Sequence, residues 1–189
     1  MIKKLKNLGV ISNNRSGFTL IEILIVIIVL GILAMIIIPQ ISVSTEDAKV
    51  STLKSNLSGI RSALEIYYAQ HDNKYPGQTT AAAGAVNNDA AVAAADMITQ
   101  LTQYTDINGQ ISGTKVAATF KFGPYLKGPT LPKNPFITDA AKAVAVLCDI
   151  TADITTARAA TVAGGEGWKY HFNTGVFYAN DGGTGHADY

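Results

Sequence analysis

The stretch GFTLIE (residues 17–22) begins an apolar run that continues to Ile38, just before Pro39. Of the 21 residues from Phe18 to Ile38, only Thr19 and Glu22 have polar side chains. Coiled as an α-helix, this run would be about 31 Å long, close to the thickness of the hydrocarbon core of a bilayer. The pattern therefore predicts a membrane-spanning helix over residues 18–39.

Glu22 stands out in this run because a carboxylate is costly in hydrocarbon. Insertion scales put the cost at about 2.5–3.5 kcal/mol at the centre of a membrane helix, and it falls toward the ends. Glu22 lies near one end of the run. An intramembrane acid indicates a functional residue with a partner. The alternative is that Glu22 reaches to the membrane interface and has no further role.

The segment before the run is basic and contains no Asp or Glu. Its charged residues are Lys3, Lys4, Lys6 and Arg15. The positive-inside tendency places such a segment in the cytoplasm. A cleaved secretory signal peptide is the competing interpretation, but its apolar region should be shorter and end at a small-residue site. The nearest such site, residues 42–44, follows Pro39.

The string SGFTLIE (residues 16–22), followed by an apolar helix, resembles the type III signal sequence of type IV pilins and type II secretion pseudopilins. This resemblance implies that a prepilin peptidase cuts between Gly17 and Phe18 on the cytoplasmic face, and that the new amine of Phe18 is N-methylated. It also implies that Glu22 recruits or registers an incoming subunit. A buried cationic amine needs a paired anion, and Glu22 can supply one within a helix or between subunits.

Beyond Pro39 the apolar residues recur on one face of a helix. They are Val50, Leu53, Leu57, Ile60, Leu64 and Tyr67. Pro39 is expected to kink this helix, which should run from Phe18 to about Gln70 and end in the breakers of residues 71–77. The predicted organisation has four parts: a cleaved leader (1–17), a transmembrane and polymerisation helix (18–39), an amphipathic helix (40–72) and a globular head (73–189).

The head is predicted to be α+β. A second helix should run from about Ala90 to Tyr104, with Asp89 or Asn88 as its N-cap and Val92, Met97 and Leu101 as further apolar positions. A turn is expected at residues 107–111. Strands at 143–150, 167–172 and 176–179 suggest a small antiparallel sheet packed on the long helix, as the pilin-like fold implies. Trp168, Tyr170 and Phe172 should face the helix, and His171 should face solvent.

Composition excludes several function classes. The formal net charge is +1 and no basic face is evident, so nucleic-acid binding is not expected. A single cysteine, Cys148, excludes an intrachain disulfide and predicts a small core residue. No phosphate-binding loop, nucleophile elbow or zinc-protease motif is present, so the chain is not expected to be an enzyme.

The C-terminal tail holds the one candidate metal site. Asn180, Asp181 and Asp188 offer hard oxygen ligands in a Gly-rich segment, which suits calcium. The resemblance to major pseudopilins implies a calcium site in this loop, while a solvated tail explains the same residues. No other cofactor is expected.

Two function classes stay open. The first is a structural subunit that polymerises with identical or related subunits into a type IV pilus or a type II secretion pseudopilus. Before that, the precursor would be inserted into the inner membrane, processed, and bound by an inner-membrane assembly machinery. The filament would then be periplasmic or at the cell surface. The second is a membrane-anchored periplasmic binding domain or enzyme that uses the helix only as an anchor. Residues 123–126 and 131–135 resemble pseudopilin G, but Phe136 and Ile137 replace its usual Trp and Gly.

Overall fold

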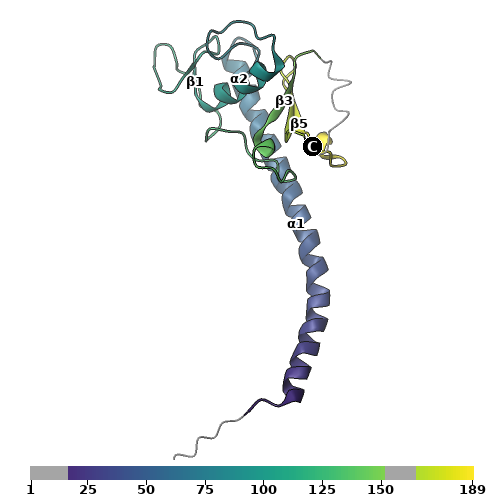
Figure 1. The fold of residues 1–189 in the computed structure, drawn as a ribbon. Coiled ribbons are helices and arrows are strands. Elements are labelled where there is room, and N and C mark those ends of the chain that lie inside the picture. Colours follow the sequence, from purple (N-terminus) through teal and green to yellow (C-terminus); the bar gives the residue numbers. More distant parts are fainter. Residues whose placement is uncertain (1–16, 152–164) are drawn as a thin grey trace, which may run out of the picture. The chain divides into compact units, whose positions relative to one another are not determined.

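A computed structural model describes residues 17–151 and 165–189, and the side chains of these residues except 37–44. The chain divides into two compact units, residues 1–45 and 46–189. The described elements are α1 (Leu20–Gln70), α2 (Ala90–Thr102), β1 (Tyr104–Thr105), β2 (Ile111–Ser112), η1 (Lys142–Val144), β3 (Val146–Asp149), β4 (Trp168–His171), β5 (Val176–Ala179) and η2 (His186–Asp188). Helices and short strands in one chain confirm the predicted α+β class (Figure 1).

The long helix matches its predicted limits closely. α1 begins at Leu20, two residues after the predicted start, and ends at Gln70. Pro39 lies within the helical backbone of α1. Because the side chain of Pro39 falls outside the described residues, the kink expected there stays a prediction.

The predicted apolar face of α1 forms one side of the head's core. Five of its six residues are at most 1% exposed: Leu53, Leu57, Ile60, Leu64 and Tyr67. Val50, at the start of the stripe, is only half-buried. Each buried side chain of this size stabilises the fold by roughly 1.5–3 kcal/mol. They share one cluster with Met97 and Leu101 of α2 and with Trp168, Tyr170 and Phe177 of the sheet.

Two residues in left-handed conformation end α1. Asp72 and Asn73 have φ angles of 51° and 57°, and the amide of Asn73 donates to the carbonyl of Tyr68 at 3.2 Å. Asp and Asn tolerate this conformation because their short polar side chains bond to the local backbone. The end predicted within residues 71–77 is therefore confirmed.

The second helix follows the cap predicted for it. The carboxylate of Asp89 accepts hydrogen bonds from the amides of Ala91 (2.8 Å) and Val92 (3.0 Å). Of the predicted apolar positions of this helix, Met97 and Leu101 are fully buried, whereas Val92 is 44% exposed. The helix ends at Thr102, and Tyr104 begins strand β1.

Strands β1 and β2 form the hairpin predicted around residues 107–111. They pair antiparallel, with Tyr104 opposite Ser112. Asp106 organises the turn, since its carboxylate accepts from the amides of Asn108 (2.9 Å) and Gln110 (2.8 Å). Gly109 supplies the positive φ of 85° that the turn requires.

The C-terminal sheet has the order β3-β4-β5 and is mixed. Strands β4 and β5 form the predicted antiparallel hairpin, with Tyr170 opposite Phe177. Strand β3 runs parallel to β4, with Cys148 opposite Tyr170, so the prediction of a wholly antiparallel sheet was wrong. A parallel pair needs a crossover of a dozen or more residues, and the chain between Asp149 and Trp168 is long enough to provide one.

His171 is buried, although its alternation with Trp168 and Tyr170 predicted exposure to solvent. The side chain is 1% exposed and stacks on Tyr178 with ring centroids 5.8 Å apart. Tyr178 is itself 1% exposed, so the second face of the sheet is also covered at this point. The prediction failed because it assumed that one face of this sheet meets water.

Candidate functional site

The predicted cleavage site lies immediately outside helix α1. Gly17, Phe18 and Thr19 are exposed and have no regular secondary structure, and the helix starts at Leu20. Phe18 is 82% exposed. The Gly17–Phe18 bond is therefore accessible and is not held in helical hydrogen bonding.

Glu22 is hydrogen-bonded to Thr19. The backbone amide and the hydroxyl of Thr19 each donate to Oε2 of Glu22 at 2.7 Å, and the amide of Glu22 donates to Oγ1 of Thr19 at 3.3 Å. Thr19 stands at the N-cap position and Glu22 three residues later, which is the geometry of a capping box. The sequence pattern indicated the amine of Phe18 as the partner of Glu22, and Thr19 was not among the predicted partners. The spacing T-x-x-E before an apolar run is the signal that would have identified this pair.

The first part of α1 exposes an apolar surface all around the helix. Its large hydrophobic residues from Leu20 to Ile36 are each at least 44% exposed. Contiguous apolar surface of this extent marks a site that another protein or a lipid covers.

Among the residues that the structure describes, no helix combines the length and the apolarity needed to cross a membrane. The membrane span assigned to residues 18–39 stays a prediction, and its last three residues have side chains outside the described part.

The three residues proposed for calcium do not form one ligand set in this fold. Oδ1 of Asp181 accepts from the amide of Gly183 (2.8 Å) and lies 2.8 Å from Nδ1 of His186. Its Oδ2 accepts from Nδ2 of Asn134 at 2.9 Å. Both carboxylate oxygens of Asp181 are therefore already satisfied by protein groups.

The other two members point elsewhere. The side-chain amide of Asn180 donates to the carbonyl of Glu166 at 3.1 Å. Asp188 is exposed and lines a hollow with Arg61 and Glu65, whereas Asp181 lines a different one with Asp139. Over residues 17–151 and 165–189, no group of three or more His, Cys, Asp or Glu side chains could hold a metal. The arrangement does not fit a calcium ion bound by Asn180, Asp181 and Asp188 together.

Cys148 lies in the core, as its sequence context predicts. The side chain is 5% exposed, and burial, with a smaller contribution from Asp149, raises the pKa of its thiol to about 12. Because only the thiolate is a nucleophile or a metal ligand, burial and the raised pKa do not favour either role for Cys148.

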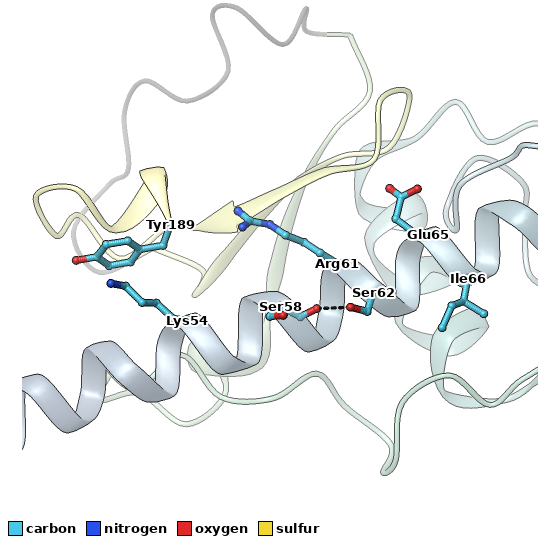
Figure 2. A pocket seen from close by; sticks show the side chains of 7 residues that line it. All are labelled: Lys54, Ser58, Arg61, Ser62, Glu65, Ile66 and Tyr189. Atoms are coloured by element: carbon cyan, nitrogen blue, oxygen red, sulfur yellow. Dashed lines mark hydrogen bonds between the residues drawn. The ribbon is translucent and has the colours of Figure 1, made fainter.

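An open hollow of about 620 Å³ follows the exposed side of α1 in the head (Figure 2). It is lined by Lys54, Ser58, Arg61, Ser62, Glu65, Ile66 and Tyr189. The ammonium of Lys54 lies 4.1 Å from the ring centroid of Tyr189, and Nε of Arg61 donates to the carbonyl of Phe177 at 2.9 Å. Its lining includes neither a histidine nor a cysteine.

Comparison with known proteins finds a family motif over the same N-terminal segment that contains the Gly17–Phe18 bond and the start of α1. Residues 12–38 match the family model of the prokaryotic N-terminal methylation motif. The type II secretion system core protein G of Pseudomonas aeruginosa is 45% identical over 53 residues, which cover 28% of this chain and 37% of that protein. The fimbrial protein of Neisseria meningitidis serogroup B is 31% identical over 110 residues, covering 54% of this chain and 64% of that protein.

A third relative is the type IV major pilin protein PilE1 of Neisseria gonorrhoeae, which is 41% identical over 68 residues (36% of this chain, 41% of the pilin). The chain thus spans less than two thirds of the length of these curated relatives. No solved structure matches it significantly. The motif and the relatives confirm the predicted resemblance: the chain carries a prepilin-type N-terminus and is similar to both pseudopilin G and type IV pilins. None of the three relatives is named as an enzyme.

Proposed function

We propose that the chain is a structural filament subunit, made as a precursor and assembled into a type IV pilus or a type II secretion pseudopilus. A prepilin peptidase removes residues 1–17, and Phe18 is N-methylated. The helix of residues 18–39 holds the precursor in the inner membrane, with its N-terminus in the cytoplasm. It then packs against the same helix of identical or related subunits in a periplasmic or cell-surface filament.

One observation carries this proposal: an accessible Gly17–Phe18 bond stands directly before a helix whose apolar side chains are exposed on every side. This surface lies inside the match to the methylation motif. A membrane covers such a helix before assembly, and neighbouring helices cover it afterwards. A plain anchor requires an apolar helix but neither a processing site nor an acid at Glu22.

The test is intact-mass and N-terminal analysis of the protein taken from its native membrane. We expect an N-terminus at methylated Phe18. A Gly17→Glu variant should keep its leader, because a charged and larger side chain replaces the small residue before the cut, whereas Gly17→Ala should be processed. An N-terminus at Met1 in the wild type would favour the anchored binding domain or enzyme instead.

A further inference from the structure

Thr19 and Glu22 form reciprocal hydrogen bonds at the start of helix α1. The first four amides of a helix have no partner within the helix. Here the hydroxyl of Thr19 accepts from the amide of Glu22 at 3.3 Å, and the Glu22 carboxylate accepts from the amide of Thr19 at 2.7 Å. The hydroxyl of Thr19 also donates to that carboxylate at 2.7 Å. These reciprocal bonds stabilise Thr19 in the non-helical conformation of an N-cap residue.

The position of this cap decides the conformation of the bond that is to be cut. With Thr19 at the N-cap, Gly17 and Phe18 remain outside the helix and exposed. Upstream, Ser16 and Asn14 also have side chains suited to N-capping. A helix that started at either of them would enclose the Gly17–Phe18 bond, and peptidases cut exposed, irregular backbone in preference to helix.

We propose that Thr19 is a positioning residue for prepilin cleavage: by capping α1 with Glu22, it keeps the Gly17–Phe18 bond outside the helix. This inference rests on the proposed function. Cleavage adds one water across the bond, leaving a carboxylate on Gly17 and an amine on Phe18 that takes up a proton. Glu22 then serves twice, first as the capping partner of Thr19 and afterwards as the anion nearest to the new ammonium group.

The two roles of Glu22 need different chemistry and can be separated. A capping box requires only a hydrogen-bond acceptor at the third helical position, and Gln serves there as well as Glu. Pairing with an ammonium group requires the negative charge. Glu22→Gln should therefore be cleaved like the wild type and then assemble poorly.

Thr19→Val makes the complementary change. It preserves the shape of the side chain but removes the hydroxyl, and with it two of the three contacts, while the charge of Glu22 remains. Thr19→Ser retains the hydroxyl and is the matched control.

The experiment compares full-length wild type, Thr19→Val, Thr19→Ser and Glu22→Gln in detergent, each cleaved by a purified prepilin peptidase and followed by intact mass. We expect kcat/KM to fall roughly three- to tenfold for Thr19→Val, the range that a lost N-cap gives. The fall should appear in KM with kcat unchanged, because a smaller fraction of the substrate is competent to bind. Thr19→Ser and Glu22→Gln should stay within about twofold of the wild type, since both retain a cap.

Equal kcat/KM for Thr19→Val and the wild type would overturn the inference while leaving the proposed function intact. An equal loss in Thr19→Val and Thr19→Ser would also overturn it, because the side chain would then be read directly by the peptidase. A wild-type chain that is not cut between Gly17 and Phe18 would remove the proposed function and this inference together.

Discussion

At the scale of single residues, His71 is buried and lies between two hydrogen-bond partners. Its Nδ1 lies 2.8 Å from the carbonyl of Tyr67, which can only accept, so Nδ1 carries the proton. Its Nε2 lies 2.9 Å from Oγ1 of Thr105, and in the neutral ring it can accept from that hydroxyl. The ring also stacks on Tyr67 at 3.7 Å and is 1% exposed. His71 thus ties the end of α1 to strand β1.

Burial lowers the pKa of His71 below its ordinary value, although backbone contacts and the charges of Asp106 and Asp72 oppose the shift. The unfolded chain then binds a proton at a pH where the folded one does not. The contribution of His71 to the free energy of unfolding should therefore be fully present above about pH 6.5. It should decrease as the pH drops toward the lowered pKa of the folded state. Urea titrations in mild detergent, followed by the fluorescence of buried Trp168, measure this dependence.

The control for this prediction is His71→Gln, which retains a donor and an acceptor but does not titrate. Its pH profile should be flatter than that of the wild type, and the difference isolates His71 from other groups such as His171, whose pKa burial also lowers. Parallel profiles for the two proteins would contradict the prediction.

At the scale of elements, the start of α2 depends on one side chain. Asp89 accepts from two backbone amides at 2.8 and 3.0 Å. Replacing it by Ala should lower the free energy of unfolding by about 1 kcal/mol, because those amides lose their partner. Asp89→Asn preserves an acceptor oxygen and should cost less. Chemical denaturation of the two variants measures the difference. Equal losses of unfolding free energy would show that the negative charge of Asp89 matters, and not its hydrogen bonds to the two amides.

The elements predicted correctly from the sequence are those whose signals are local. The end of α1, the cap of α2 and the turn of the β1–β2 hairpin depend on residues within a few positions of one another, and all three were confirmed. The direction of β3 was not predicted correctly, because a short apolar strand has the same alternation whether its neighbour runs parallel or antiparallel.

At the scale of the whole head, the side chain of Asp181 connects the C-terminal loop to other segments of the fold. Its side chain is fully buried and contacts Asn134, Gly183 and His186. Asn134 in turn donates to the carbonyl of Gly167 at 2.8 Å, at the start of β4. The ring of His186 packs on Phe136 with centroids 4.1 Å apart. The C-terminal loop is thereby joined to the segment before η1 and to the residue before β4, the central strand of the sheet.

We expect Asp181→Ala to lower the free energy of unfolding by about 2–4 kcal/mol, because it leaves buried donors without an acceptor. Asp188→Ala removes an exposed carboxylate and should change it by less than about 0.5 kcal/mol. Thermal unfolding of both variants with and without calcium tests the metal prediction as well. A wild-type stabilisation by calcium that both variants lose would support a calcium site built by both carboxylates, against the arrangement described for this loop.

The sequence alone determined the parts of this protein that depend on local pattern: the processing motif, the limits of the long helix, its buried stripe and the β4–β5 hairpin. Tertiary structure decided the burial of His171, the parallel direction of β3 and the partners of Asp181. A periodic pattern shows which side chains share a face, because the geometry of one element sets that. What covers the face, and which polar group from a distant segment meets it, depends on how the elements pack, and no single stretch of sequence contains that information.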